Sequence, residues 1–155
     1  MKLFLVQHAK AKNKNEDPTR PLSEKGWKDI KKIAKYAEEY LHIDIRQIFH
    51  SGKLRAEQTA EVLAKDLNPP EKVTIDKNLE PLGDPKAWKR QLIETTEDVM
   101  LVGHLPHLSK LASSLLFSNE DQKAIAFKMG GIVCLQRGQQ HRWTIQWMIT
   151  PEIIS

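Results

Sequence analysis

The 155-residue sequence has almost no cysteine and no long hydrophobic segment, and both absences restrict what the protein is. Cys134 is the only cysteine, so no disulfide can form within the chain. It stands in an apolar run, which favours a buried thiol over a nucleophile. No apolar run is long enough to cross a bilayer, and the first one meets polar residues too early for a signal peptide. We therefore expect a cytoplasmic protein that has no membrane partner.

The sequence also lacks the motifs of a nucleic-acid-binding protein, although its net charge is +4. No arginine cluster is interleaved with aromatic residues, so we do not expect nucleic acid as a partner. The lysines between positions 28 and 35 share their helical pattern with carboxylates, which is typical of a solvated helix face. An anionic small molecule or an acidic protein remains compatible with the charge. The length, the 40% hydrophobic content and the absence of repeats predict one domain over residues 1–155.

Short apolar runs alternate with helical patterns along the first two thirds of the chain. Buried strands are predicted at 3–6, 43–49, 73–75 and 99–102. Helices are predicted at 23–41, at 54–67, at 86–95 and from Pro106, which we place at the first helical position. Two further strands, at 132–135 and 143–147, are joined by a hairpin-like turn. This order predicts a three-layer α/β/α sandwich that has a mostly parallel sheet and an antiparallel edge.

Polar residues follow three of these predicted strands at their carboxyl ends, which is where ligands bind in open α/β sheets. His8 follows the first strand, and His104 follows the strand at 99–102. After the second strand, a tight turn at Ser51 leads into a helix whose first turn contains Arg55. Free N–H groups at such a helix start bind anions, and a guanidinium adds a bidentate donor. If the strands are parallel neighbours, His8, Arg55 and His104 meet in one crevice.

Each of these residues also has an alternative interpretation. A histidine after a strand can simply cap that strand, and Arg55 can pair with Glu57 on its own helix or with a surface carboxylate. A zinc site is conceivable for His8, His104 and His107. No carboxylate motif accompanies these histidines, so we expect neither a metal nor another cofactor.

Several short motifs occur in this chain in a characteristic order. The first is Gln7-His8-Ala9-Lys10, which differs only at its first residue from the sequence Arg-His-Ala-Lys. The others are Arg20-Pro21-Leu22-Ser23 with Gly26, Ser51 through Ala60, Gly83-Asp84-Pro85, and Val102-Gly103-His104-Leu105-Pro106. Together they resemble the histidine phosphatase superfamily, and specifically its SixA-like phosphohistidine phosphatase branch. The resemblance spans nearly the whole chain.

The resemblance implies a metal-independent hydrolase in which His8 attacks phosphorus, and water then hydrolyses the phosphohistidine intermediate. Arg55 and His104, together with N–H groups at the helix start, would bind the phosphoryl oxygens. The residues expected at the rim of the site are Lys10, Arg20 and Ser51. The implied partners are inorganic phosphate and a signalling or phosphotransfer protein that carries phosphohistidine.

Two positions depart from the family pattern. Gln7 stands where the family has its first arginine, so a neutral amide replaces a charge-assisted phosphate contact of about 1.5 to 3 kcal/mol. This favours a second hypothesis, a weak or inactive module that binds phosphate or phosphohistidine. A third hypothesis, a small-molecule phosphomonoesterase, needs Glu80 or Asp84 as general acid, and Glu80 is one position out of step with the family. Phosphohistidine needs less help, because imidazole leaves readily once it is protonated.

Overall fold

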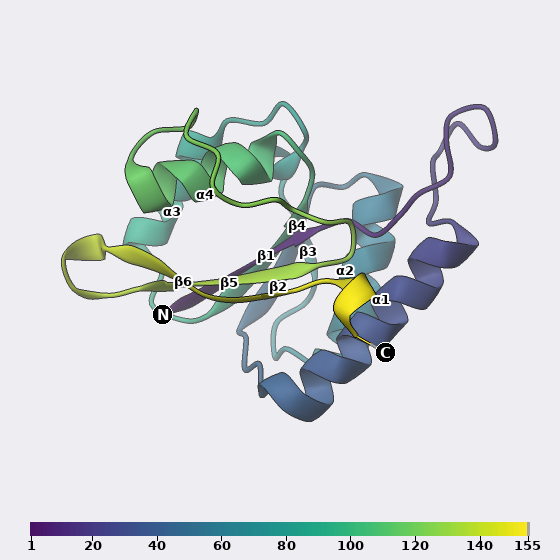
Figure 1. Ribbon diagram of the computed structural model, residues 1–155, viewed down its shortest axis with the longest axis horizontal. Coiled ribbons are helices and arrows are strands. Elements are labelled where there is room, and N and C mark those ends of the chain that lie inside the picture. Colours follow the sequence, from purple (N-terminus) through teal and green to yellow (C-terminus); the bar gives the residue numbers. More distant parts are fainter. Residues whose placement is uncertain (155) are drawn as a thin grey trace.

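The computed structural model describes residues 1–154, in which a six-stranded sheet lies between two layers of helices (Figure 1). The strands are β1 (Lys2–Gln7), β2 (Gln47–His50), β3 (Thr74–Ile75), β4 (Val99–Gly103), β5 (Ile132–Arg137) and β6 (Trp143–Ile149). The main helices are α1 (Glu24–Tyr36), which continues through a π-helical turn, α2 (Leu54–Leu67), α3 (Pro85–Glu94) and α4 (His107–Phe117). The predicted three-layer α/β/α architecture is confirmed.

The order of the strands determines which residues meet at the sheet edge. Across the sheet the order is β3-β2-β4-β1-β5-β6. The strands β3, β2, β4 and β1 are parallel, whereas β5 and β6 form the predicted antiparallel edge. Because β2, β4 and β1 are parallel neighbours, their carboxyl ends lie side by side. The residues that follow these three strands are therefore brought together.

The side chains of β1 show how the sheet is buried on both faces. Phe4 and Val6 pack with residues of α1 and α2, whereas Leu3 and Leu5 pack with residues of α3 and α4. None of the four is more than 2% exposed. Alternate residues of a strand point to opposite faces, so a strand covered on both sides requires a continuous apolar run.

Several element boundaries differ from the prediction, among them the starts of β2 and α4. The strand expected at 43–49 begins only at Gln47, because its neighbour β4 begins at Val99, the residue with which Gln47 pairs. Ile45 is nevertheless buried in the core, which explains its apolar character. Pro106 precedes α4 as its N-cap residue and is not the first helical residue. Neither difference displaces the residues at the carboxyl ends of the strands.

The lone cysteine is buried, as its apolar surroundings predict. Cys134 lies on β5, where it packs into the core. Burial raises the pKa of its thiol to about 11, so the group is uncharged at neutral pH and contributes to packing. Within residues 1–154, no helix has the length and the apolar content that a membrane crossing requires.

Candidate active site

The chain at the end of β1 is held by hydrogen bonds to two other elements. His8 N–H donates to Gly103 O on β4 at 3.0 Å, which extends the ladder one residue past the strand. Ala9 N–H donates to Thr59 Oγ1 on α2 at 3.0 Å. The Thr59 hydroxyl in turn donates to Arg55 O at 2.7 Å. The backbone at His8 is therefore tied both to the neighbouring strand and to the helix that carries Arg55.

The start of α1 fixes the residues that follow His8. Lys10 O accepts hydrogen bonds from Ser23 N–H at 2.9 Å and from the Ser23 hydroxyl at 3.1 Å. Ser23 is the N-cap of α1, and its hydroxyl oxygen also accepts Gly26 N–H at 3.1 Å. A Cβ atom at position 26 would lie 2.0 Å from Lys10 O, so this close approach requires glycine.

A hydrogen bond from the His8 ring determines which of its nitrogens is free. Nδ1 lies 2.7 Å from Ala9 O, and a carbonyl oxygen only accepts, so Nδ1 carries the proton. Burial lowers the pKa of His8 to about 4; the Ala9 hydrogen bond opposes this shift, and the positive charges of Arg55 and Arg20 add to it. The ring is therefore neutral at pH 7 and has a lone pair on Nε2. A neutral imidazole in this tautomer is a nucleophile.

His104 lies beside His8, at the end of the neighbouring strand. The two ring centroids are 5.0 Å apart, and the ring planes are tilted by 50°. His104 Nε2 lies 2.7 Å from Ser51 Oγ, and this oxygen also accepts Lys53 N–H at 3.2 Å. The other ring nitrogen, Nδ1, is buried and has no hydrogen-bond partner among the described residues. Burial and the nearby positive charges lower the pKa of His104 to about 3, so this ring is also neutral at pH 7.

Arg55 contributes a positive charge from the first turn of α2. Its Nε is buried without a hydrogen-bond partner, and no ion pair in the part of the chain that the structure describes includes it. The alternative in which Arg55 pairs with Glu57 is therefore wrong. Burial lowers the pKa of Arg55, and the charge of Arg20 lowers it further. Arg20, whose Nε donates to Lys12 O at 3.0 Å, thus adds to the positive potential of the site.

The other residues expected at the site lie in different surroundings. Gln7 is half-buried, and its Oε1 has no partner among the described residues. Ser51, which was expected at the rim, is only 1% exposed and lies against His104. Lys10 is exposed and lines a neighbouring groove. The sequence does not predict the role of the Thr59 hydroxyl, because no neighbouring residue indicates its hydrogen bond with Ala9, 50 positions away.

The two carboxylates considered as general acids lie on the loop before α3. Asp84 is exposed and caps α3, and its carboxylate accepts Lys86 N–H at 2.9 Å. Glu80 is half-buried and ends the short 3-10 turn at Lys77–Leu79. Asp84 thus has a structural role as the N-cap of α3.

His107 is fully buried at the start of α4. Its ring lies near the backbone of Asp84, but neither ring nitrogen forms a hydrogen bond of normal geometry. Over residues 1–154, no three His, Cys, Asp or Glu side chains are grouped closely enough to hold a metal ion. The three histidines considered as zinc ligands, His8, His104 and His107, therefore do not form such a site.

Comparison with protein families gives one match for this chain. Residues 3–84 match the model of the histidine phosphatase superfamily (branch 1). This segment is more than half of the chain, and it includes His8 and Arg55. The chain belongs to the histidine phosphatase superfamily. The resemblance inferred from the motifs is therefore confirmed.

Individual relatives place this member of the superfamily among the SixA-like proteins. It is 25% identical to phosphohistidine phosphatase SixA of Escherichia coli, over 97% of this chain and 94% of the relative. It is 33% identical to an uncharacterized protein of Picosynechococcus sp., over 89% of this chain and 86% of the relative. A structure of the protein histidine phosphatase SixA complexed with tungstate matches at a TM-score of 0.86 and 25% identity, over 99% of both chains.

Proposed function

We propose that this histidine phosphatase hydrolyses phosphohistidine on another protein, with His8 as the nucleophile. The observation that carries the proposal is the 2.7 Å hydrogen bond from His8 Nδ1 to Ala9 O. It leaves the lone pair of a neutral ring on Nε2, beside His104 and within the positive potential of Arg55. The substrate class is supported by the similarity to SixA of Escherichia coli, a phosphohistidine phosphatase.

In the first step, Nε2 of His8 attacks phosphorus, and the bond between phosphorus and the substrate imidazole breaks. The leaving imidazole takes up a proton from solvent, which its pKa of about 6.5 permits at neutral pH. The His8 ring gains positive charge as its bond to phosphorus forms, and the Nδ1–H bond to Ala9 O stabilises that charge. In the second step, water attacks phosphorus, the bond to Nε2 breaks, and inorganic phosphate is released.

His104 and Arg55 bind the phosphoryl oxygens in this proposal. The oxygen of the Ser51 hydroxyl accepts Lys53 N–H, so its own proton is available for His104 Nε2. His104 then carries its proton on Nδ1, the buried nitrogen without a partner, and donates it to a phosphoryl oxygen. Arg55 Nε is a second buried donor without a partner. The tungstate bound by SixA, a tetrahedral oxyanion, is consistent with such donors.

Hydrolysis of a phosphohistidine peptide by the wild-type protein and by His8→Ala tests the proposal. The wild type should release phosphate and form an acid-labile phosphorylated protein during turnover, and His8→Ala should do neither. His42→Asn is a matched control, because this histidine is exposed at the end of α1, and it should retain both properties. Turnover that survives in His8→Ala would assign the nucleophile to another residue.

Gln7 favours a second candidate function, a module that binds phosphate or phosphohistidine without turnover. Its side chain is neutral and its Oε1 is buried without a partner among the described residues, so it lacks the charge-assisted phosphate contact that the family arginine provides. Calorimetric titration with phosphate, beside turnover of the phosphohistidine peptide and of p-nitrophenyl phosphate, separates the two candidates. Binding without turnover of either substrate supports the module. Turnover of p-nitrophenyl phosphate alone indicates a small-molecule phosphomonoesterase.

A further inference from the structure

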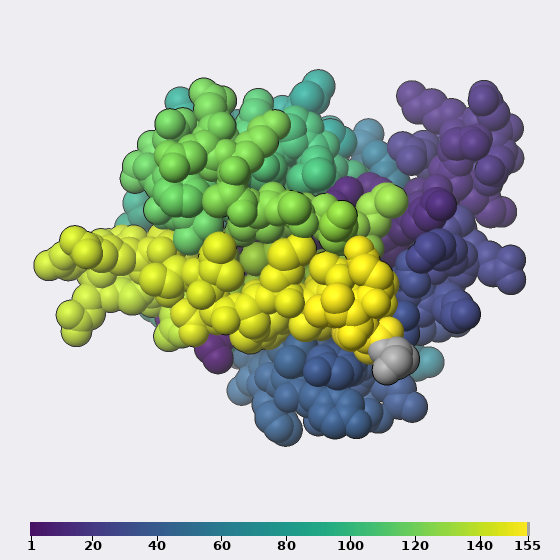
Figure 2. Space-filling model, in the orientation of Figure 1, coloured from purple at the N-terminus to yellow at the C-terminus, as the bar shows by residue number. Residues whose placement is uncertain are grey.

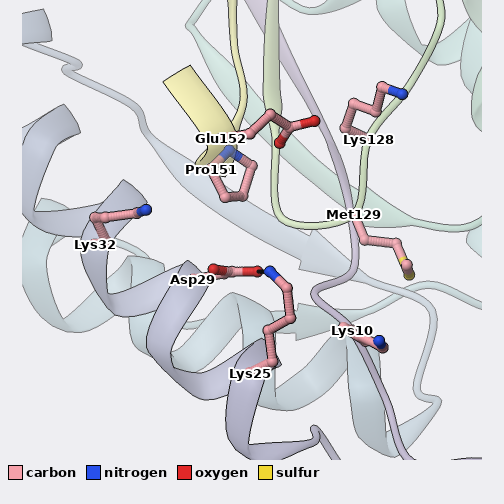
Figure 3. Close-up of a pocket in the computed structure, with 8 residues that line it drawn as sticks. All are labelled: Lys10, Lys25, Asp29, Lys32, Lys128, Met129, Pro151 and Glu152. Atoms are coloured by element: carbon pink, nitrogen blue, oxygen red, sulfur yellow. Dashed lines mark hydrogen bonds and ion pairs between the residues drawn. The ribbon is translucent and has the colours of Figure 1, made fainter. Parts of the chain in front are cut away.

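A groove lined by lysines begins two residues after His8. It has a volume of about 340 Å³, and α1 forms one of its sides (Figure 3). The other side is formed by Met129, which precedes β5, and by Pro151, which follows β6. In Figure 2 the C-terminal residues (yellow) lie between the helical region that includes α1 (blue) and the segment leading into β5 (green). The lysines of the groove are Lys10, Lys25, Lys32 and Lys128.

The groove has an excess of positive charge, because its four lysines face only two carboxylates. One carboxylate, Asp29, is paired with Lys25 at 2.6 Å. The other, Glu152, forms no ion pair within the described part of the chain, and neither do the remaining three lysines. Figure 3 shows the amines of Lys32 and Lys128 on opposite sides of Glu152. Three ammonium groups are therefore available for a ligand.

Hydrogen bonds connect both sides of the groove to the residues that flank His8. On the helix side, Lys10 O accepts Ser23 N–H at 2.9 Å. On the other side, Gly130 N–H donates to Gln7 O at 2.9 Å, one residue after Met129. The groove therefore lies next to the segment that carries His8.

We propose that this groove binds an acidic segment of the phosphorylated partner protein, next to the phosphohistidine in the active site. The inference rests on the proposed function, because it names the kind of protein that presents the substrate. Carboxylates complement the unpaired lysines, and Met129, which is 43% exposed, offers an apolar contact that a peptide uses and a phosphate ion does not. Exposed ion pairs are individually weak and are screened by salt, so several must act together.

Two phosphohistidine peptides of equal length test this docking surface, one with glutamates beside the phosphohistidine and the other with glutamines at the same positions. For the wild type at low ionic strength, kcat/KM should be about tenfold higher for the glutamate peptide. The ratio should approach one at about 0.5 M salt. In the double variant Lys32→Glu/Lys128→Glu the ratio should fall to one or below. Thermal unfolding verifies that each variant is folded.

The double variant Lys65→Glu/Lys72→Glu is the matched control. It changes the net charge by the same amount at exposed lysines outside the groove, so the preference for the glutamate peptide should persist. If the control variant also loses the preference, the proposed binding of an acidic segment in the groove is wrong, and the effect is one of net charge alone. Equal kcat/KM of the wild type for both peptides would also overturn the groove, while the hydrolysis itself upholds the proposed function.

If neither peptide is hydrolysed, the proposed function fails, and the groove is judged by binding. Titration with the unphosphorylated glutamate and glutamine peptides then gives the two affinities. Tighter binding of the glutamate peptide that is lost in Lys32→Glu/Lys128→Glu supports the groove. Equal affinities overturn it.

Discussion

At the residue scale, each histidine of the candidate site is held by one ring nitrogen. His8 is held by Nδ1, which donates to Ala9 O, and His104 is held by Nε2, which contacts Ser51 Oγ. The free nitrogens are therefore Nε2 of His8 and Nδ1 of His104. In the proposed mechanism the two neutral rings therefore have different roles, His8 as a lone-pair donor through Nε2 and His104 as a hydrogen-bond donor through Nδ1.

Removal of the Ser51 hydroxyl should impair catalysis through His104. We expect Ser51→Ala to lower kcat for the phosphohistidine peptide by about tenfold or more, because the ring loses the partner that fixes its orientation and its proton. A double-mutant cycle with His104→Ala checks this. In the His104→Ala background, Ser51→Ala should cause no further loss. A full additional loss there would show that Ser51 acts independently of His104.

Substitution of Gln7 should show whether position 7 faces the phosphoryl group. Gln7→Arg should tighten inhibition by inorganic phosphate by about tenfold to a hundredfold, because a charge-assisted contact contributes about 1.5 to 3 kcal/mol. Gln7→Met is the control, since it has a similar size and no charge, and it removes an oxygen that has no partner. Equal inhibition constants for the arginine and methionine variants would place this side chain away from the phosphate.

At the element scale, the sequence predicts where apolar segments are buried but not where they pair. The runs that became β1 and β4 are flanked on both sides by other strands, so their apolar length matches their strand length. Ile43 and Ile45 alternate with polar residues as a strand does, yet the ladder begins only at Gln47. Both isoleucines pack in or against the core from a segment that precedes β2 and has no partner on β4, because β4 begins only at Val99. Their alternating pattern indicates that the side chains are buried, and it does not distinguish a paired strand from an unpaired segment.

The same distinction applies to the candidate site. His8 and His104 could be placed at one sheet edge from the sequence, because both end apolar runs of a predicted parallel sheet. The contacts that orient these two rings could not be predicted from the sequence. Ser51 lies against His104, and Thr59 bonds Ala9, because of side-chain positions that depend on the packing of α2 against the sheet. No periodicity or spacing in the chain encodes such a contact.

The start of α1 gives a prediction about this packing. Gly26→Ala places a methyl group 2.0 Å from Lys10 O, so the helix and the segment after His8 must separate. We expect a loss of about 1 to 3 kcal/mol in the free energy of unfolding, measured by urea denaturation, and a fall in turnover. Gly138→Ala is the control, because its methyl group would meet nothing closer than Arg142 O at 3.6 Å. Equal stability of the two variants would contradict the close approach.

At the scale of the whole molecule, the fold buries several histidines in their neutral form. The pKa of His8 is lowered to about 4 and that of His104 to about 3, chiefly by burial. Burial also lowers the pKa of His50 and of His107. In the unfolded chain a histidine titrates at about 6.5. At pH values between the lowered pKa values of the folded protein and about 6.5, the unfolded chain binds more protons than the folded one. Stability is therefore highest above about pH 6.5 and falls as the pH falls.

Thermal unfolding at several pH values tests this linkage. Between about pH 7.5 and about pH 5, His8 and His104 should each lower the free energy of unfolding by ~2 kcal/mol, so Tm should fall across this range. The double variant His8→Gln/His104→Gln should show a flatter dependence, because it lacks both of these titrating groups. A wild-type Tm that is constant between these two pH values would show that the rings are protonated in the folded protein.

The position of β1 in the sheet also determines when the candidate active site can form in a newly made chain. Leu3 pairs with Val99 on one side and with Leu135 on the other, so the strand before His8 is synthesised long before either neighbour. Until then, a strongly apolar segment has no partner and is open to aggregation or to chaperone binding. A ribosome-bound chain that lacks β4 and β5 cannot position His8. The candidate active site therefore forms only late in biosynthesis.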